Sequence, residues 1–112
     1  MTHRLLIVDD NSDYRTLVRY ALADCAVKVV GEASTPTAGI ARARELQPDL
    51  VLLDIVHRGE DGLGAIRPLQ EAAPKATIVA VAAYAEHELW SRAPNVHNVA
   101  YLPKSTLPTR LC

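Results

Sequence analysis

The chain of 112 residues is 49% hydrophobic and 22% charged, and its formal net charge at pH 7 is -1. This length and composition predict one globular domain with a real core and exclude an intrinsically disordered chain. The balanced charge gives no reason to expect direct nucleic-acid binding, and the apolar runs are too short for a membrane span or a signal peptide, so we expect a cytoplasmic protein.

An unbroken apolar run opens the pattern and leads directly into the two acids Asp9 and Asp10. A run without alternation is typical of a strand buried on both faces, and we predict this strand at Leu5–Asp9. Polar capping residues and apolar residues at helical spacing then predict a helix from about Ser12 to Ala23. A β-branched strand is predicted at Val27–Ala33.

A second helix, capped by Thr35 or Ser34 and with Pro36 in its first turn, is predicted to run to about Leu46. It is followed by a strand at Leu50–Asp54, which is again an apolar run that ends in an acid.

The next unit consists of a loop at Val56–Asp61, a helix from Gly62 to about Ala73 and a strand at Thr77–Ala82. Pro68 should kink or shorten this helix, because an interior proline lacks an N–H and costs ~3 kcal/mol.

The last part of the chain is the most irregular. We predict a short helix at Glu86–Arg92, broken by Pro94-Asn95, and a fifth strand at Val99–Leu102. The tail at residues 105–112 is too short for a full helix. Cys25 and Cys112 lack metal-ligand spacing and are expected to be reduced thiols, not a disulfide.

Strands that alternate with helices indicate βαβ units with right-handed crossovers, and therefore a parallel sheet covered on both faces. We expect a flavodoxin-like α/β three-layer sandwich with a five-stranded parallel sheet in the order 2-1-3-4-5. Residues 1–112 form a single domain in this reading, and the last helix is reduced to a stub at about 105–112.

Three acids fall at the carboxyl ends of predicted strands: Asp9, Asp10 and Asp54. In the expected strand order, the first and third strands flank the point where ligands bind in open α/β sheets. Three carboxylates there favour a hard divalent cation such as Mg2+, and Lys104 after the fifth strand adds a positive charge. Acids, a metal ion and a lysine that meet in one crevice form a suitable site for a phosphoryl group. The plainer alternative is that these are solvated loop acids and a helix cap.

Four motifs together resemble the receiver domain of two-component response regulators, in the CheY-like superfamily. They are Leu6-Ile7-Val8-Asp9-Asp10, Leu52-Leu53-Asp54, Asp61-Gly62 and Tyr101-Leu102-Pro103-Lys104. The ending Lys104-Ser105-Thr106 is more similar to receivers of regulators with a helix-turn-helix output domain than to the chemotaxis type.

The resemblance implies a role for each matching residue. Asp54 is the implied phosphoacceptor, Lys104 the contact to the phosphoryl oxygens and Tyr101 the rotameric aromatic of the signalling face. The implied Mg2+ ligands are Asp10, Asp54 and the backbone carbonyl of Val56, with Asp9 assisting through water.

The sequence departs from the family pattern at several positions. Ala82 stands where the family has a serine or threonine whose hydroxyl binds the phosphoryl group. A charge-assisted hydrogen bond contributes roughly 1.5–3 kcal/mol, so we expect phosphorylation to survive and switching to weaken. Arg58 replaces a usual proline, and the segment around Pro94 and the final helix are also altered.

We therefore predict a phosphorelay receiver that takes a phosphoryl group from a histidine kinase or phosphotransfer protein onto Asp54 with Mg2+. Its downstream protein partner is unknown, and we expect a monomer or weak dimer. The alternative is a pseudo-receiver, a protein-binding module that works without phosphorylation. An aspartyl phosphatase is disfavoured because the residue two positions after Asp54 is Val56 rather than an acid.

Overall fold

The computed structural model describes residues 2–56, 62–82 and 98–106. Its strands are β1 (His3–Val8), β2 (Val27–Ala33), β3 (Leu50–Asp54), β4 (Thr77–Ala82) and β5 (Val99–Pro103). Its α-helices are α1 (Ser12–Ala21), α2 (Pro36–Leu46) and α3 (Ile66–Ala72), and two 3-10 helices are η1 (Leu63–Ala65) and η2 (Lys104–Thr106).

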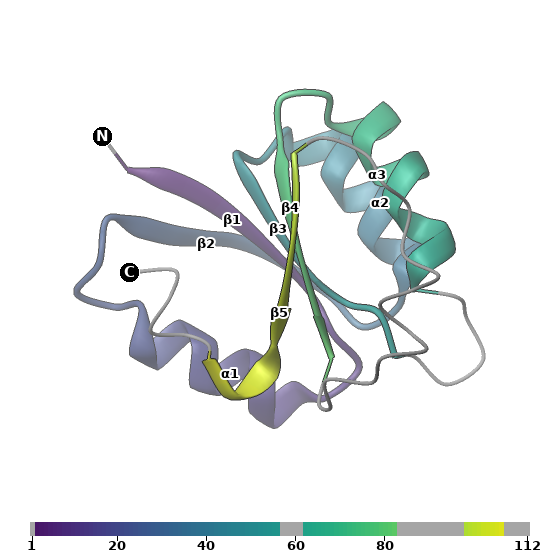
Figure 1. Cartoon of the computed structure of the whole chain (residues 1–112). Coiled ribbons are helices and arrows are strands. Elements are labelled where there is room, and N and C mark those ends of the chain that lie inside the picture. Colours follow the sequence, from purple (N-terminus) through teal and green to yellow (C-terminus); the bar gives the residue numbers. More distant parts are fainter. Residues whose placement is uncertain (1, 57–61, 83–97, 107–112) are drawn as a thin grey trace.

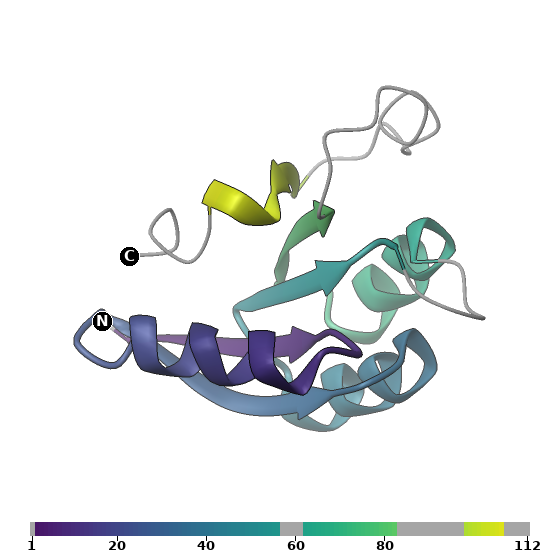
Figure 2. The same cartoon turned by 90° about the horizontal axis from the view of Figure 1, so that it is seen from below.

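The five strands form one parallel sheet in the order β2-β1-β3-β4-β5, which confirms the predicted fold class and strand order. Helix α1 lies on one face of the sheet, and α2 and α3 lie on the other (Figures 1 and 2). The strand order reverses between β1 and β3, so their carboxyl ends define the place where such sheets bind ligands.

Strand β1 shows why an unbroken apolar run marks the middle of this sheet. Leu5 and Ile7 point into the core on the α1 side, where they join Val18. Leu6 and Val8 point into the core on the α2 and α3 side. Because β1 pairs with both β2 and β3, all four side chains from Leu5 to Val8 are fully buried.

The helix starts follow the predicted capping chemistry. The Asn11 side-chain oxygen accepts hydrogen bonds from the N–H groups of Asp13 and Tyr14 at 3.0 and 3.1 Å. The Thr35 hydroxyl accepts from the N–H of Ala38 at 3.1 Å, so Thr35 and not Ser34 is the N-cap of α2. These caps satisfy N–H groups that have no partner within the helix.

Pro68 shortens the third helix, as expected. The region begins as the 3-10 helix η1, and α3 starts only at Ile66, which places Pro68 in its first turn. A missing N–H is tolerated there because the first N–H groups of a helix lack intrahelical acceptors. Gly62 is required just before η1, since a Cβ atom there would lie 2.4 Å from the Cα of Ile55.

Two predicted segments lie outside the described residues: the helix at Glu86–Arg92 and the tail beyond Thr106.

The prediction for Cys25 was wrong. Cys25 is disulfide-bonded and not a reduced thiol, because spacing along the chain does not determine which sulfur atoms meet in space. No helix among the described residues is long and apolar enough to cross a membrane.

Candidate functional site

The three acids meet at the carboxyl edge of the sheet. Asp54 is the last residue of β3, and Asp9 directly follows β1, whose Val8 pairs with Leu53. The carboxylate oxygens that Asp9, Asp10 and Asp54 offer lie within 4.8 Å of one another. Asp9 and Asp54 are only 1% and 5% exposed, whereas Asp10 is exposed. We call these three residues the acidic cluster.

Lys104 reaches the acidic cluster from the carboxyl end of the edge strand β5. It is the first residue of η2, after β5. Its Nζ lies 2.7 Å from Oδ2 of Asp9 and 3.2 Å from Oδ2 of Asp54. The ammonium group therefore lies between the two buried carboxylates and offsets their mutual repulsion.

Each buried carboxylate uses its other oxygen to hold its own turn. Oδ1 of Asp54 accepts a hydrogen bond from the N–H of Val56, and Oδ1 of Asp9 accepts one from the N–H of Asn11, both at 2.9 Å. Oδ2 of Asp9 makes the ion pair with Lys104 but is not aligned for a hydrogen bond with any partner in the described part of the chain. This buried oxygen retains acceptor capacity for a cation.

The protonation equilibria reflect this mixture of burial and charge. Burial raises the pKa of Asp54, and the neighbouring Asp9 charge adds to that rise, while the Val56 N–H and Lys104 oppose it. Burial alone would lower the pKa of Lys104, but its contacts with Asp9 and Asp54 outweigh that effect and raise it. The lysine is thus held in its charged form by the acids.

Tyr14 of α1 forms part of the surroundings of Lys104. The Lys104 Nζ lies 4.4 Å from the centroid of the Tyr14 ring, a cation–π contact. Burial, followed by the charges of Asp9 and Asp54, raises the pKa of Tyr14 to about 12. Its buried hydroxyl has no hydrogen-bond partner in the described part of the chain. In the sequence, Tyr14 was recognisable only as a member of the apolar face of its helix.

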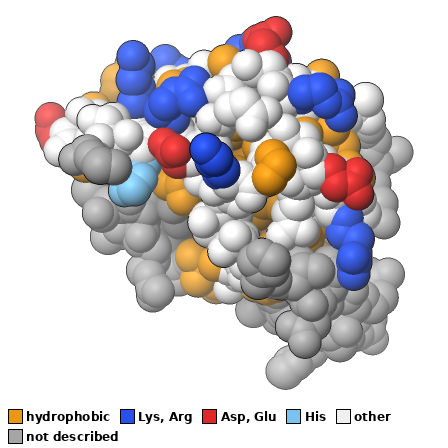
Figure 3. Space-filling view, turned by 90° about the horizontal axis from the view of Figure 1, so that it is seen from above, with side chains coloured by type: hydrophobic (Ala, Val, Ile, Leu, Met, Phe, Trp, Pro, Cys, Tyr) orange, Lys and Arg blue, Asp and Glu red, His pale blue; other side chains and the backbone are white. Residues whose placement is uncertain are grey.

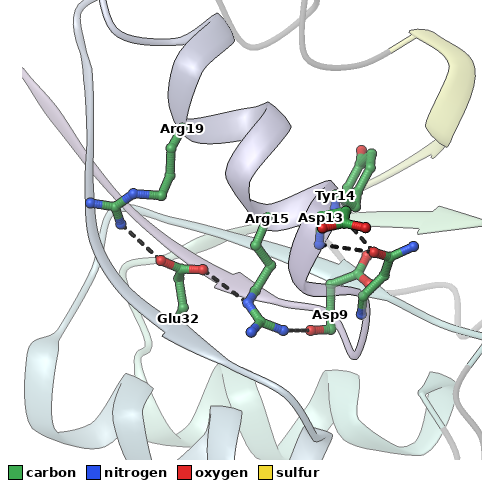
Figure 4. Close-up of polar contacts among 7 residues, drawn as sticks. Asp9, Asp13, Tyr14, Arg15, Arg19 and Glu32 are labelled. Carbon is green, nitrogen blue, oxygen red and sulfur yellow. Dashed lines mark hydrogen bonds and ion pairs between the residues drawn. The ribbon is translucent and has the colours of Figure 1, made fainter.

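A second group of charges borders the acidic cluster on the side of β2 (Figure 4). Glu32 of β2 bonds Arg15 through one carboxylate oxygen and Arg19 through the other, both at 2.9 Å. Arg15 also donates a hydrogen bond to the backbone carbonyl of Asp9. Sequence reasoning missed this group; the available signal was two arginines four residues apart on one helix face, near an acid in an adjacent strand.

The other residues named by the resemblance lie around the same edge. Ala82 ends β4, pairs with Pro103 of β5 and is fully buried in the core on the α2 and α3 side. Its strand lies between β3, which ends in Asp54, and β5, which leads to Lys104. Tyr101 of β5 is half-buried and packs against the core on the α2 and α3 side. Val56 is exposed and holds Asp54 through its N–H.

The donor set suits a hard cation. It consists of carboxylate oxygens, one of them buried and without a hydrogen bond, and this is the ligand chemistry that Mg2+ prefers. The face of the molecule shown in Figure 3 is different, because acidic and basic side chains are interspersed there. The residues present therefore fit a divalent cation at the acidic cluster.

Comparison with known proteins gives consistent matches. Residues 5–112 match the response regulator receiver domain family. The chain is 36% identical over 102 residues to the response regulator GacA of Pseudomonas viridiflava, covering 90% of this chain and 48% of that protein. It is 30% identical over 107 residues to the response regulator protein VraR of Staphylococcus aureus (strain Mu3), with 95% and 51% covered.

A solved structure supports the same relationship. The crystal structure of a two-component response regulator of the LuxR family from Aurantimonas sp. SI85-9A1 matches with a TM-score of 0.83 at 26% identity, covering 99% of this chain and 80% of that one. The chain spans about half the length of the curated relatives it matches.

Proposed function

The chain belongs to the response regulator receiver domain family, and from this membership we propose that it accepts a phosphoryl group on Asp54 in a two-component phosphorelay. The observation that carries the proposal is the joint placement of the acidic cluster and Lys104. A buried carboxylate, two neighbouring acids and a cation converge at the carboxyl edge of a parallel sheet. Receiver domains interact with histidine kinases or phosphotransfer proteins, and either class is the expected donor.

The proposed reaction is a single group transfer. A carboxylate oxygen of Asp54 attacks the phosphorus of a phosphohistidine, an O–P bond forms, the N–P bond breaks, and the released imidazole takes up a proton. The product is an acyl phosphate on Asp54. The N–H of Val56 orients the Asp54 carboxylate, and the Lys104 ammonium lies where it can bind a phosphoryl oxygen.

We propose that Asp10, Asp54 and the backbone carbonyl of Val56 hold Mg2+ directly and that Asp9 assists through water. When bound, the cation supplies positive charge that neutralises the carboxylates and the phosphoryl oxygens. The close approach of the three carboxylates supports a cation at the acidic cluster, whereas the division into direct and water-mediated ligands follows from the family resemblance.

We propose further that phosphorylation at Asp54 switches this protein weakly. The buried methyl group of Ala82 cannot donate a hydrogen bond to a phosphoryl oxygen, so the bond that would draw the end of β4 toward Asp54 is missing. Tyr101, the proposed rotameric aromatic on the neighbouring strand β5, would then respond less to phosphorylation.

Ala82 also favours a second candidate function. A pseudo-receiver would bind a partner equally well with and without a phosphoryl group on Asp54, because a ligand with equal affinity for two states shifts neither. Partner affinity measured with and without a phosphoryl mimic at Asp54 separates the two functions. A difference of tenfold or more supports the switch, and equal affinities support the binding module.

The first test of phosphotransfer uses acetyl phosphate as a small phosphodonor with Mg2+. We expect incorporation of one phosphoryl group, detected by intact-protein mass spectrometry, and its loss in Asp54→Ala. Asp24→Ala is the matched control, because Asp24 is an exposed acid with no bond to the acidic cluster among the described residues. The proposal fails if no phosphate is incorporated or if Asp54→Ala is labelled as well as the native protein.

A further inference from the structure

We propose that Arg15 is a positioning residue for the acidic cluster, acting through the backbone carbonyl of Asp9. The guanidinium of Arg15 is anchored on Glu32 of β2 and fixes the turn that carries Asp9 and Asp10 (Figure 4). The part of this inference that concerns metal affinity rests on the proposed function, whereas the part that concerns the order of the turn does not.

The geometry of Arg15 is that of a clamp between three elements. It lies on α1 and is 17% exposed; its Nε lies 2.9 Å from Oε1 of Glu32, and another nitrogen donates to the carbonyl of Asp9. The planar guanidinium holds its donors at fixed angles, so one bond restricts the direction of the other. Glu32 thereby determines where Arg15 holds the end of β1.

Both polar groups of the Asp9 backbone are hydrogen-bonded. Its N–H donates to the carbonyl of Ala33 at 3.0 Å, and its carbonyl accepts from Arg15. That carbonyl belongs to the planar peptide group between Asp9 and Asp10, so its orientation places the N and Cα atoms of Asp10 and restricts where the Asp10 side chain starts. The carboxylate of Asp10 is exposed and makes no hydrogen bond within the described part of the chain, so its placement depends on this backbone.

Arg19 provides an internal comparison. It bonds the other oxygen of Glu32 at 2.9 Å, it is 51% exposed, and it does not bond the Asp9 carbonyl, which accepts from Arg15. Arg15 and Arg19 therefore share a partner, a charge and a helix, and differ in the contact with Asp9. If the two arginines served only to bind Glu32, replacing either one would have the same effect on the acidic cluster.

The sign of the charge effect separates positioning from electrostatics. Removing a positive charge near the acidic cluster should by itself strengthen the binding of a cation. Loss of a group that orients metal ligands should weaken it, typically by 10–100-fold. Weaker Mg2+ binding after loss of the Arg15 charge would therefore report on geometry.

The experiment compares Arg15→Gln, Arg19→Gln and Arg15→Lys with the native protein. Mg2+ affinity is measured by isothermal titration calorimetry. Hydrogen exchange without metal is measured at the amides of Asp9 and Asn11, which donate hydrogen bonds to the Ala33 carbonyl and to Oδ1 of Asp9. For Arg15→Gln we expect a Mg2+ Kd raised about tenfold and faster exchange at both amides. For Arg19→Gln we expect a Kd within about twofold of the native value and unchanged exchange. Arg15→Lys retains the charge but lacks the planar guanidinium that bonds Glu32 and the Asp9 carbonyl together, so it should resemble Arg15→Gln.

Mg2+ affinity and hydrogen exchange test the metal site and the role of Arg15 separately. If the native protein fails to bind Mg2+, the metal assignment is wrong, and hydrogen exchange alone decides the role of Arg15. The inference is overturned if Arg15→Gln and Arg19→Gln behave alike in hydrogen exchange, or if Mg2+ binds Arg15→Gln as tightly as the native protein. Should Arg15→Gln fail to fold, Arg15→Lys provides the same comparison.

Discussion

Replacing Lys104 with methionine tests the balance of charge on which the site depends. The substitution retains a long unbranched side chain and removes the ammonium that lies 2.7 Å from Asp9 and 3.2 Å from Asp54. The carboxylate oxygens of those two acids lie within 4.8 Å of each other, and at an effective dielectric constant of about 20 two unit charges so placed repel by at least about 3.5 kcal/mol. Relaxation and entering water reduce this, so we expect the free energy of unfolding to fall by about 2–3 kcal/mol at neutral pH without metal.

The pH dependence of this loss has a defined sign. Lys104 lowers the pKa of Asp54 against the larger effect of burial, so its removal raises that pKa further above the usual range of an aspartate. A carboxyl group whose pKa is higher in the folded state favours folding below its unfolded pKa, and that contribution is lost as the pH rises through the folded pKa. The difference between Lys104→Met and the native protein should therefore shrink as the pH falls toward about 4.

The assay is urea unfolding followed by circular dichroism, in EDTA and then in excess Mg2+. We expect Mg2+ to stabilise Lys104→Met more than the native protein, because the cation replaces the missing charge. Lys75→Met is the matched control, since Lys75 is exposed and makes no ion pair among the described residues. The reasoning is refuted if Lys104→Met is as stable as the native protein in EDTA, or if its loss of stability is the same at every pH.

Three further substitutions test single contacts. Ala82→Ser restores a hydroxyl at the end of β4; we expect a phosphoryl mimic on Asp54 to slow hydrogen exchange along β5 in this variant more than in the native protein, and an equal response in both would contradict the role given to Ala82. Tyr14→Leu should lower the free energy of unfolding by about 0.5–2 kcal/mol relative to Tyr14→Phe, because phenylalanine keeps the ring beneath Lys104; equal stabilities in urea would rule out a significant cation–π contribution. Gly62→Ala should destabilise the protein by more than about 2 kcal/mol, since its Cβ would meet the Ile55 backbone at 2.4 Å, and a melting temperature within a degree of the native value would show that the close approach relaxes without cost.

The sequence allowed the fold and much of the candidate site to be predicted because both depend on local signals. The apolar run from Leu5 to Val8 is buried on both faces, as its lack of alternation indicated. The acids fall at strand ends, and parallel strands bring their carboxyl ends to one edge, so Asp9 and Asp54 were expected to meet. A capped start of α2 at Thr35 or Ser34 and the shortening of α3 at Pro68 followed in the same way from the N–H groups of a first helical turn, which lack intrahelical partners; the structure selects Thr35.

Other features depend on which side chains meet across the fold. Lys104 was expected near the acids because it follows the fifth strand, but its position between Asp9 and Asp54 required the lengths and register of β3, β4 and β5. The disulfide at Cys25 was missed because sequence spacing says little about distances between elements.

The sequence by itself determined the elements, the layers and the end of the strands where the acids gather, because these follow from hydrophobic periodicity, capping residues and the direction of the strands. The strand order was expected from the order common in such sheets, and the structure has it. Only the tertiary structure decided what surrounds those acids. The Tyr14 ring against Lys104, and the clamp from Glu32 through Arg15 to the Asp9 carbonyl, join residues of different elements at distances of a few ångströms. No local pattern specifies such contacts, since each depends on how a helix is rotated and seated on the sheet.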